Sequence, residues 1–170
     1  CAAFEVPLDH DDPDGKTLEL AVLRIAGEQP VEGVMMFNPG GPGIPTLPQA
    51  QVMEGFFDVV APHHDVVLVD NRGVGQSTPV DCVELEDVAD IEFAENLESV
   101  AEVEAQQRIV ERVLSRCRDL VGDERLRHLG TTDVARDMDA VRDALEVEQL
   151  SFVGGSYGTV QGYVYAQLFP

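Results

Sequence analysis

The chain has 170 residues, 44% of them hydrophobic and 25% charged, which is the composition of one ordinary globular domain. Its formal net charge of −21 argues against binding to nucleic acid or to anionic membranes. No apolar run approaches the roughly 20 residues of a membrane-spanning helix. The opening "CAAFEVPLDH" lacks the basic and apolar regions of a signal peptide and an initiator methionine, so we expect the gene product to begin upstream.

The first half of the chain predicts short strands separated by turns. "FEVPLDH" and "TLELAVLRIAG" flank the turn sequence Asp-Asp-Pro-Asp-Gly, which predicts an antiparallel hairpin. "GVMMFN" and "DVVLVDNRGVG" are apolar runs that each end in a glycine-containing loop. Continuous apolar runs of this length are typical of strands that are covered on both faces.

The second half predicts helices and one more strand. The acidic stretch from Glu84 to Glu102 predicts a solvated connection. Ser99 and Glu102 have the spacing of a capping box for a helix that reaches Val121. The apolar stripe of this helix would consist of Val103, Val110, Leu114, Cys117 and Val121.

A further helix is predicted from about Thr132, with Asp133 placed favourably near the positive end of the helix dipole. Its apolar stripe would consist of Val134, Met138, Val141 and Leu145. The strand "LSFV" and a last helix carrying Val160, Val164 and Leu168 complete the chain. This alternation predicts one α/β domain over residues 1–170, with a mostly parallel sheet, an antiparallel N-terminal hairpin and helices on both faces.

The stretch "LSFVGGSYGTVQG" places Ser156 where the last strand turns into the last helix. A turn this tight brings Gly154 and Gly158 together, so side chains there would collide. This is the nucleophile-elbow pattern, which presents a serine hydroxyl for covalent catalysis. The alternative is a glycine-rich turn that only packs a strand against a helix.

The loop "NPGGPG" directly follows the "VMMF" strand. Acyl transfer requires N–H donors for the oxyanion of the tetrahedral intermediate. We expect one donor from Tyr157, the residue after the serine, and one from Gly41, because Pro39 and Pro42 have no N–H. A plain tight turn is the alternative, and a phosphate-binding loop is disfavoured because no Gly-Lys-Ser/Thr follows.

The three cysteines are Cys1, Cys82 and Cys117, and no CxxC pair or histidine-rich cluster accompanies them. The sequence therefore predicts no metal site and no cofactor. On spacing alone, Cys82 and Cys117 could form a disulfide or remain two separate thiols.

Through these motifs the chain resembles the α/β-hydrolase superfamily, and within it the secreted tripeptidyl- and prolyl-aminopeptidase-like serine hydrolases. The resemblance covers nearly the whole chain outside the acidic segment. It rests on five stretches in the same order: "FEVPLDHDDPDGKTLELAV", "NPGGPG", "VVLVDNRGVGQS", "TTDVARDMDAVRDAL" and "LSFVGGSYGTVQGYVYAQLFP".

The resemblance implies a role for each matching residue. Ser156 would be the nucleophile, and Gly41 and Tyr157 would supply the oxyanion hole. The supporting residues of the elbow and loops would be Gly40, Gly43, Gly154, Gly155, Gly158, Asp70 and Arg72, with Gly73, Gly75 and Ser77 in the loop of Asp70 and Arg72. Arg72 would tie backbone carbonyls and acids together near the site.

The resemblance also implies a secreted or cell-envelope location and a disulfide between Cys82 and Cys117, with the partner of Cys1 upstream of the chain. One segment departs from the family pattern. After "NPGGPG" the family continues with small residues, whereas this chain has residues 44–48, "IPTLP". The approach to the serine is therefore lined differently, which leaves the substrate preference open.

In this fold the acid and the histidine base follow the serine along the chain. The histidines here are His10, His63, His64 and His128, and all precede Ser156. We expect them to be structural or on the surface, and we expect the acid and base in polypeptide C-terminal to Pro170. The 170 residues would then be the N-terminal half of the fold, without its lid, and inactive and poorly soluble alone.

The predicted function is a serine hydrolase that works through an acyl-enzyme and removes single residues or short peptides from peptide N-termini. Its partner would be a peptide or a small ester or amide substrate. An esterase or lipase on the same fold is one alternative. A binding module of hydrolase ancestry that has lost its chemistry is the other.

Overall fold

A computed structural model describes residues 1–27, 32–83 and 99–170. By its internal contacts the chain divides into two compact units, residues 1–79 with 128–170, and Val80–Arg127. Among the residues that the structure describes, no helix combines the length and the apolar character that crossing a membrane requires.

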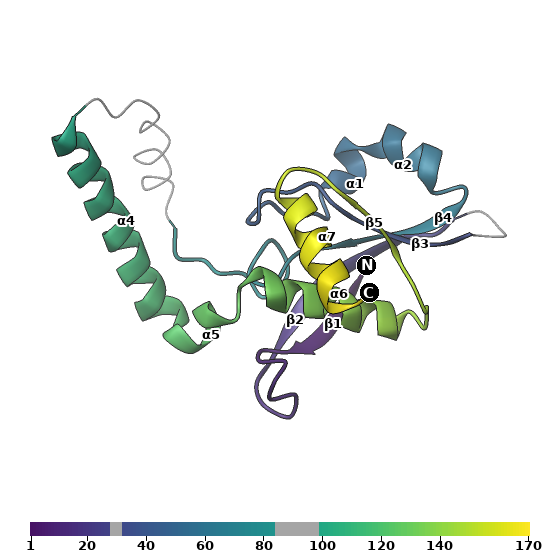
Figure 1. Ribbon diagram of the computed structural model, residues 1–170, viewed down its shortest axis with the longest axis horizontal. Coiled ribbons are helices and arrows are strands. Elements are labelled where there is room, and N and C mark those ends of the chain that lie inside the picture. Colours follow the sequence, from purple (N-terminus) through teal and green to yellow (C-terminus); the bar gives the residue numbers. More distant parts are fainter. Residues whose placement is uncertain (28–31, 84–98) are drawn as a thin grey trace. The chain divides into compact units, whose positions relative to one another are not determined.

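The first unit is built on a five-stranded sheet with the order β1-β2-β4-β3-β5 (Figure 1). β1 (Ala2–Pro7) and β2 (Thr17–Ile25) form the predicted antiparallel hairpin, and β2 continues antiparallel to β4 (His64–Val69). β3 (Gly33–Asn38) is parallel to β4 on one side and to β5 (Ser151–Gly154) on the other. The predicted mostly parallel sheet with an antiparallel start is confirmed.

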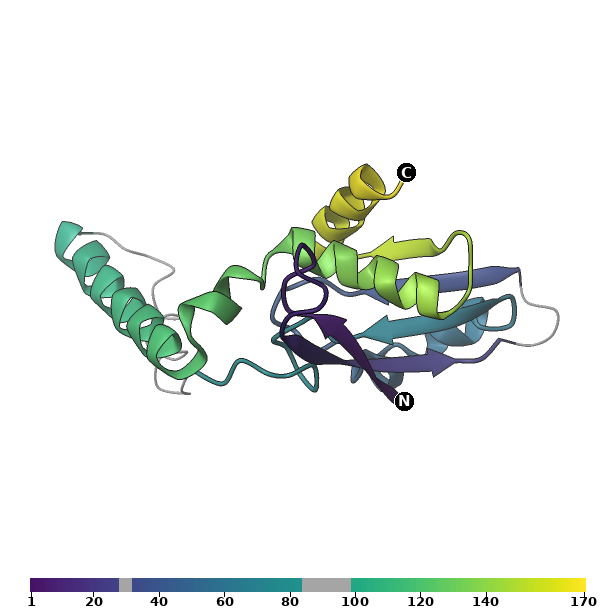
Figure 2. The same cartoon turned by 90° about the horizontal axis from the view of Figure 1, so that it is seen from below.

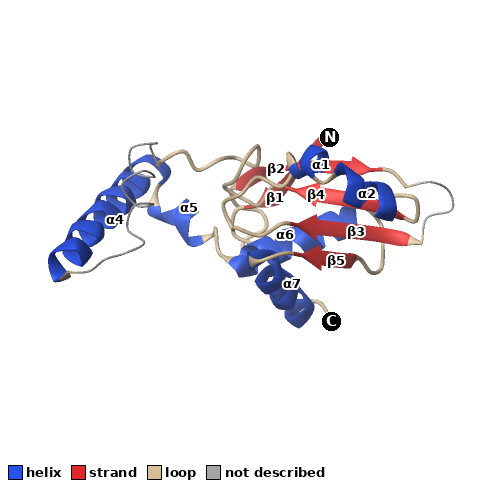
Figure 3. Cartoon of the chain, turned by 90° about the horizontal axis from the view of Figure 1, so that it is seen from above, coloured by secondary structure: helices blue, strands red, loops and turns tan. Residues whose placement is uncertain are grey.

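Both faces of the sheet are covered, as the continuous apolar runs of β3 and β4 predicted (Figure 2). Alternate residues of a strand point to opposite faces. On one face Val34, Met36, Val67 and Val69 pack against α6 (Thr131–Ala144) and α7 (Tyr157–Leu168). On the other, the intervening residues Met35, Phe37, Val66 and Leu68 pack against Phe57 of α2 (Glu54–Val60), which follows α1 (Gln49–Val52) (Figure 3).

The helix α6 buries the predicted side. Val134, Met138 and Val141 are buried, and Leu145, directly after the helix, packs against the same core.

For α7 the expected apolar positions are confirmed at Val164, which packs against the core, and wrong at two positions, since Val160 and Leu168 are 45% and 41% exposed. The residues that this helix buries are Gly158, Gln161 and Tyr165. The reason is the turn before it, which directs Gly158 against the backbone of Asn38 and fixes the rotation of the whole helix.

The second unit contains α4 (Val100–Val121) and α5 (Asp123–Arg127). The predicted capping box is present, since the Ser99 hydroxyl accepts from the Glu102 N–H and the Glu102 carboxylate accepts from the Ser99 N–H. Most of the acidic stretch expected as a solvated connection, residues 84–98, lies outside the described residues.

Cys82 and Cys117 form the disulfide that the resemblance implied. Only one side of α4 is buried, at Val113 and Cys117 around this disulfide. The predicted stripe is therefore correct at Cys117 and at Val121, which packs against the same core, and wrong at three positions, since Val103, Val110 and Leu114 are 41%, 43% and 52% exposed. The second unit thus has a small core centred on the covalent link.

We expect the second unit to depend on this disulfide. The bond closes a loop with a sequence separation of 35 residues. Closing a loop of this length stabilises a fold by about 3–4 kcal/mol on the chain-entropy model. Replacing both Cys82 and Cys117 by serine should accelerate amide hydrogen exchange throughout α4. The matched control is Cys1→Ser, which removes an exposed cysteine outside the disulfide. Equal exchange in the double variant and the control would contradict the prediction.

Candidate active site

Ser156 lies at the turn between β5 and α7 in a backbone conformation that L-residues rarely adopt. Its φ is 46° and its ψ is −121°, and the residue is exposed. Such conformations persist where the surroundings enforce them, and they are concentrated at functional sites. The serine therefore sits on a strained bend with its side chain accessible from solvent.

The glycines before and after Ser156 are required by close backbone contacts. A Cβ added at Gly154 would lie 2.6 Å from the carbonyl carbon and oxygen of Gly158. A Cβ at Gly158 would lie 2.5 Å from the carbonyl oxygen of Asn38, at the end of β3. At Gly155 the contact is looser, 3.0 Å from the carbonyl oxygen of Pro39. The turn is thus tight within itself and is pressed against the end of β3.

The loop after β3 meets this turn at Gly40. A Cβ there would lie 2.5 Å from the carbonyl oxygen of Gly155, 2.7 Å from the Cβ of Ser156 and 2.8 Å from the amide nitrogen of Tyr157. Gly40 also has a φ of 100°, which favours glycine for a second reason. Two segments more than a hundred residues apart in sequence therefore share one backbone contact at Ser156.

The backbone N–H groups of Gly41 and Tyr157, beside this contact, have no hydrogen-bond partner within the described part of the chain, and neither do those of Ser156 and Gly43. Tyr157 is the first residue of α7, where N–H groups have no acceptor inside the helix. The N–H of Gly40, by contrast, donates to the Asn38 Oδ1 at 2.9 Å. The two predicted donors are thus among the unoccupied N–H groups of this loop and turn.

Gly43 and Ile44 continue the same loop, the first in open space and the second against Gly41. Gly43 has open space where a Cβ would stand and no positive φ, so its environment does not require glycine. The side chain of Ile44, the first residue of the unusual "IPTLP" segment, is 50% exposed. Its Cδ1 lies 2.5 Å from the position of a Cβ on Gly41. An apolar side chain therefore covers one side of the Gly41 backbone.

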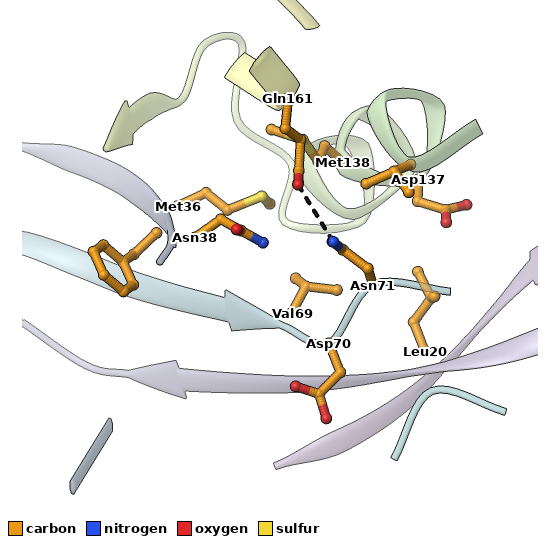
Figure 4. Close-up of a pocket in the computed structure, with 11 residues that line it drawn as sticks. Leu20, Met36, Asn38, Val69, Asp70, Asn71, Asp137, Met138 and Gln161 are labelled. Atoms are coloured by element: carbon orange, nitrogen blue, oxygen red, sulfur yellow. Dashed lines mark hydrogen bonds between the residues drawn. The ribbon is translucent and has the colours of Figure 1, made fainter. Parts of the chain in front are cut away.

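The Asp70 carboxylate holds the loop after β3 to the loop after β4. It is fully buried, and its Oδ1 accepts from the N–H groups of Thr46 at 2.6 Å and Leu47 at 2.9 Å. Its Oδ2 accepts from the Gln76 N–H at 2.9 Å, and Gly75 leaves room for this oxygen. The carboxylate points away from Asn71 and Gln161 (Figure 4). Asp70 is placed to shape the loops rather than to meet a substrate.

Arg72 ties three parts of the first unit together, as the resemblance implied. Its side chain is fully buried, and Nε and Nη2 donate to the two carboxylate oxygens of Asp137 at 2.7 and 2.6 Å. The remaining N–H groups face the carbonyl oxygens of Pro7, Leu8 and His128 at 2.8 to 3.1 Å. A guanidinium has five N–H donors, so Arg72 has none left for a ligand.

Asp137 is the site residue that sequence reasoning missed. It is buried on α6, between the apolar positions Val134 and Val141. A carboxylate within the buried stripe of a helix is rare unless it is paired, and that signal was present in the sequence. Its partner Arg72 is 65 positions away, so only the fold reveals the pair.

None of the four histidines occupies a position from which it meets Ser156. His10 is largely buried and lies 2.9 Å from Asp137 and 3.0 Å from Arg72. His63 and His64 are at the start of β4, the end of the sheet away from the turn. His128 lies between Asp9 and Asp133, with N···O distances of 3.9 and 3.8 Å. All four have the structural or surface placements that were expected.

A hollow of about 140 Å³, the Tyr157 hollow, lies beside the turn of Ser156. It is bounded by the loop after β3, the loop after β4, the start of α6 and the start of α7, and its lining residues are Pro42, Asn71, Arg72, Gly73, Val74, Leu129, Thr131, Val134, Tyr157 and Gln161. Beneath it, a cavity of about 10 Å³ shares Asn71, Val134 and Gln161 with the hollow (Figure 4). In open α/β sheets ligands bind at this edge, the carboxyl ends of the parallel strands. Among the described residues no group of three or more His, Cys, Asp or Glu could hold a metal ion.

A family model described as the alpha/beta hydrolase fold matches residues 33–170, which is most of the chain. The chain belongs to this family. The matched region begins at β3 and includes the Gly40 loop, Asp70, Arg72 and the turn of Ser156.

Relatives of known name fall within the same family. The chain is 35% identical over 177 residues to a tripeptidyl aminopeptidase of Streptomyces coelicolor, covering 100% of this chain and 32% of the relative. It is 35% identical over 156 residues to carboxylesterase B of Mycobacterium tuberculosis, covering 85% of this chain and 28% of the relative. The chain thus spans about a third of the length of the curated relatives it matches.

A solved structure of proline iminopeptidase from Mycobacterium smegmatis has the same fold. Its TM-score to this chain is 0.55 at 16% sequence identity, and the likeness covers 99% of this chain and 40% of that one.

We expect Gly40→Ala to be poorly tolerated, because the new methyl group would meet backbone atoms that cannot move independently. The overlap and the positive φ together should lower the free energy of unfolding by about 2–4 kcal/mol. Gly43→Ala is the matched control, since it adds the same atoms to the same loop in open space. Urea unfolding of the two variants is the measurement. Equal stability would show that the Gly40 contact does not constrain the loop.

We also expect Asp137→Asn to be strongly destabilising, although the two side chains have the same shape. The substitution leaves the buried Arg72 charge without its carboxylate, which typically costs about 3–5 kcal/mol. Asp143→Asn, on the exposed side of the same helix, is the control and should have no measurable effect. Thermal unfolding compares the two, and similar melting temperatures would refute the role given to Asp137.

Proposed function

We propose that this chain carries the nucleophile and the oxyanion-binding loop of a serine hydrolase that works through an acyl-enzyme. The observation that carries the proposal is the contact of Gly40 with Gly155, Ser156 and Tyr157. The N–H groups of Gly41 and Tyr157 have no partner among the described residues, and this contact supports their placement beside the exposed serine. A tight turn that served only for packing would need neither the exposed hydroxyl nor a second loop with free donors.

In the proposed reaction the Ser156 Oγ attacks the carbonyl carbon of the substrate while its proton passes to a base. The carbonyl oxygen becomes an oxyanion, which accepts hydrogen bonds from Gly41 and Tyr157. Collapse of the intermediate expels the protonated leaving group and leaves an ester on Ser156. Water then attacks this ester, and the hydroxyl of Ser156 is restored when the acid product departs.

The base and its orienting acid are proposed to come from polypeptide beyond these 170 residues. The placement of His10, His63, His64 and His128 supports this, since each is engaged elsewhere or lies at another part of the sheet. On this proposal, residues 1–170 are the N-terminal part of one catalytic domain and are inactive alone.

We propose peptides with a free N-terminus as substrates, from which single residues or short peptides are released. The name of the Streptomyces coelicolor relative, which matches over the whole chain, supports this choice. The carboxylesterase relative supports an ester substrate as the second candidate. The turn and loop would serve an amide bond and an ester bond equally well. The choice between the two substrate classes therefore depends on groups that recognise the substrate amine.

We propose that the protein works in an extracellular or cell-envelope compartment. The disulfide between Cys82 and Cys117 supports this, because such bonds persist mainly in oxidising compartments.

The nucleophile is tested by labelling the complete polypeptide with a serine-directed fluorophosphonate. We expect one label per chain, located on Ser156, and none in Ser156→Ala. We also expect that variant to lose turnover by about 10⁴-fold or more. The control is Ser151→Ala, which removes the exposed serine at the start of β5. Labelling that persists in Ser156→Ala would contradict the assignment.

The substrate class is tested with four substrates that share one acyl group. Two are p-nitroanilides and two are p-nitrophenyl esters, and each pair has one member with a free N-terminus and one with an acetylated N-terminus. An aminopeptidase should lose most of its activity when the amine is acetylated. An esterase should cleave both esters at similar rates, and that result would replace the first candidate by the second.

A further inference from the structure

The Tyr157 hollow lies beside the turn of Ser156 and has no part in the proposed reaction. Pockets for whole ligands have volumes of about 300–1,000 Å³, so a hollow of about 140 Å³ has room for one side chain or a short acyl chain. Pro42 and Tyr157 belong to the two segments that would hold the carbonyl oxygen. A group attached to the carbonyl carbon therefore lies within reach of the hollow.

The walls of the hollow offer no charge that is free to bind a ligand. Val74, Leu129 and Val134 supply apolar surface, with the Tyr157 ring beside them. The one cation in the lining, Arg72, gives all its donors to Asp137 and to backbone carbonyls. A charged group entering the hollow would lose its hydration and would meet no free opposite charge.

Asn71 and Gln161, at the base of the hollow, are hydrogen-bonded to each other. The Asn71 Nδ2 lies 3.4 Å from the Gln161 Oε1, and the Gln161 Nε2 donates to the Met138 sulfur at 3.2 Å (Figure 4). Gln161 and Val134 are buried, so the hollow is closed on the side of α6 and α7. Nothing that enters it can leave by another route through these helices.

The Tyr157 ring is a fixed wall. Its hydroxyl shares a hydrogen bond of 2.5 Å with the Thr131 Oγ1, which joins the first residue of α7 to the first residue of α6. A wall anchored at its far end does not swing aside for a larger group. The hollow should therefore select by size as well as by polarity.

We propose that the Tyr157 hollow binds an uncharged, apolar group attached to the carbonyl carbon of the substrate and so sets the acyl preference of the enzyme. The proposal rests on the proposed function. A hollow that is closed on the side of α6 and α7 suits the acyl group, which stays bonded to Ser156 until the second half of the reaction. It does not suit the leaving group, which must depart first.

The test uses two variants of the complete polypeptide that change the hollow in opposite directions. Val74→Phe fills it and Leu129→Ala enlarges it. The control is Val59→Phe, the same substitution as the first at a position on α2 that is 72% exposed. The substrates are p-nitrophenyl acetate, butanoate and hexanoate, which share one leaving group. The measured quantity is the ratio of kcat/KM between acyl chains, which is independent of the active fraction of each preparation.

The wild type and Val59→Phe should prefer butanoate to acetate by about tenfold or more. Val74→Phe should reduce this ratio at least about tenfold, and Leu129→Ala should raise the ratio of hexanoate to butanoate by a similar factor. If Val74→Phe fails to fold, Leu129→Ala alone decides.

Ratios in both hollow variants equal to the wild-type ratios, with Ser156 still labelled by the fluorophosphonate, would overturn this inference and leave the proposed function standing. Absence of both labelling and turnover in the wild type would overturn the proposed function and this inference with it.

Discussion

The structure around Ser156 depends on one backbone contact, between Gly40 at the end of β3 and the turn that follows β5. The missing side chain of Gly40 lets its backbone approach Gly155, Ser156 and Tyr157 more closely than any other residue could. Because β3 and β5 are adjacent parallel strands, both loops leave the sheet at the same edge. The register of the two strands and the glycines of the two loops thus combine to bring free N–H groups beside an exposed serine.

Two buried charged residues hold the loops that surround this contact. Asp70 fixes the segment after the Gly40 loop through the N–H groups of Thr46 and Leu47, and Arg72 binds the hairpin, the loop before α6 and Asp137. Both are saturated by protein groups, so they give rigidity and leave no charge available. Arg72 lines the Tyr157 hollow, and because all its donors are used the hollow is still suited to an apolar group.

The parts of the fold that follow from local chemistry could be predicted from the sequence. The strands β3 and β4, the capping box of α4, the buried stripe of α6 and the tight turn at Ser156 all follow from neighbouring residues. Two of the three apolar positions expected on α7 were wrong because tertiary contacts, not the hydrophobic pattern, set the rotation of that helix at Gly158. The pairing of Arg72 with Asp137 and the shape of the Tyr157 hollow need residues from four segments, and no local pattern specifies them. Gly43 matches the motif, although its surroundings do not require glycine.

We propose that the loop of Gly40 and Gly41 and the turn of Ser156 together receive a developing oxyanion. The most direct test is a crystal structure of the complete protein after reaction with a fluorophosphonate. We predict phosphorus bonded to the Ser156 Oγ and a phosphoryl oxygen about 2.7–3.1 Å from the amide nitrogens of both Gly41 and Tyr157. A phosphoryl oxygen that points into solvent, with neither nitrogen in hydrogen-bond range, would contradict it.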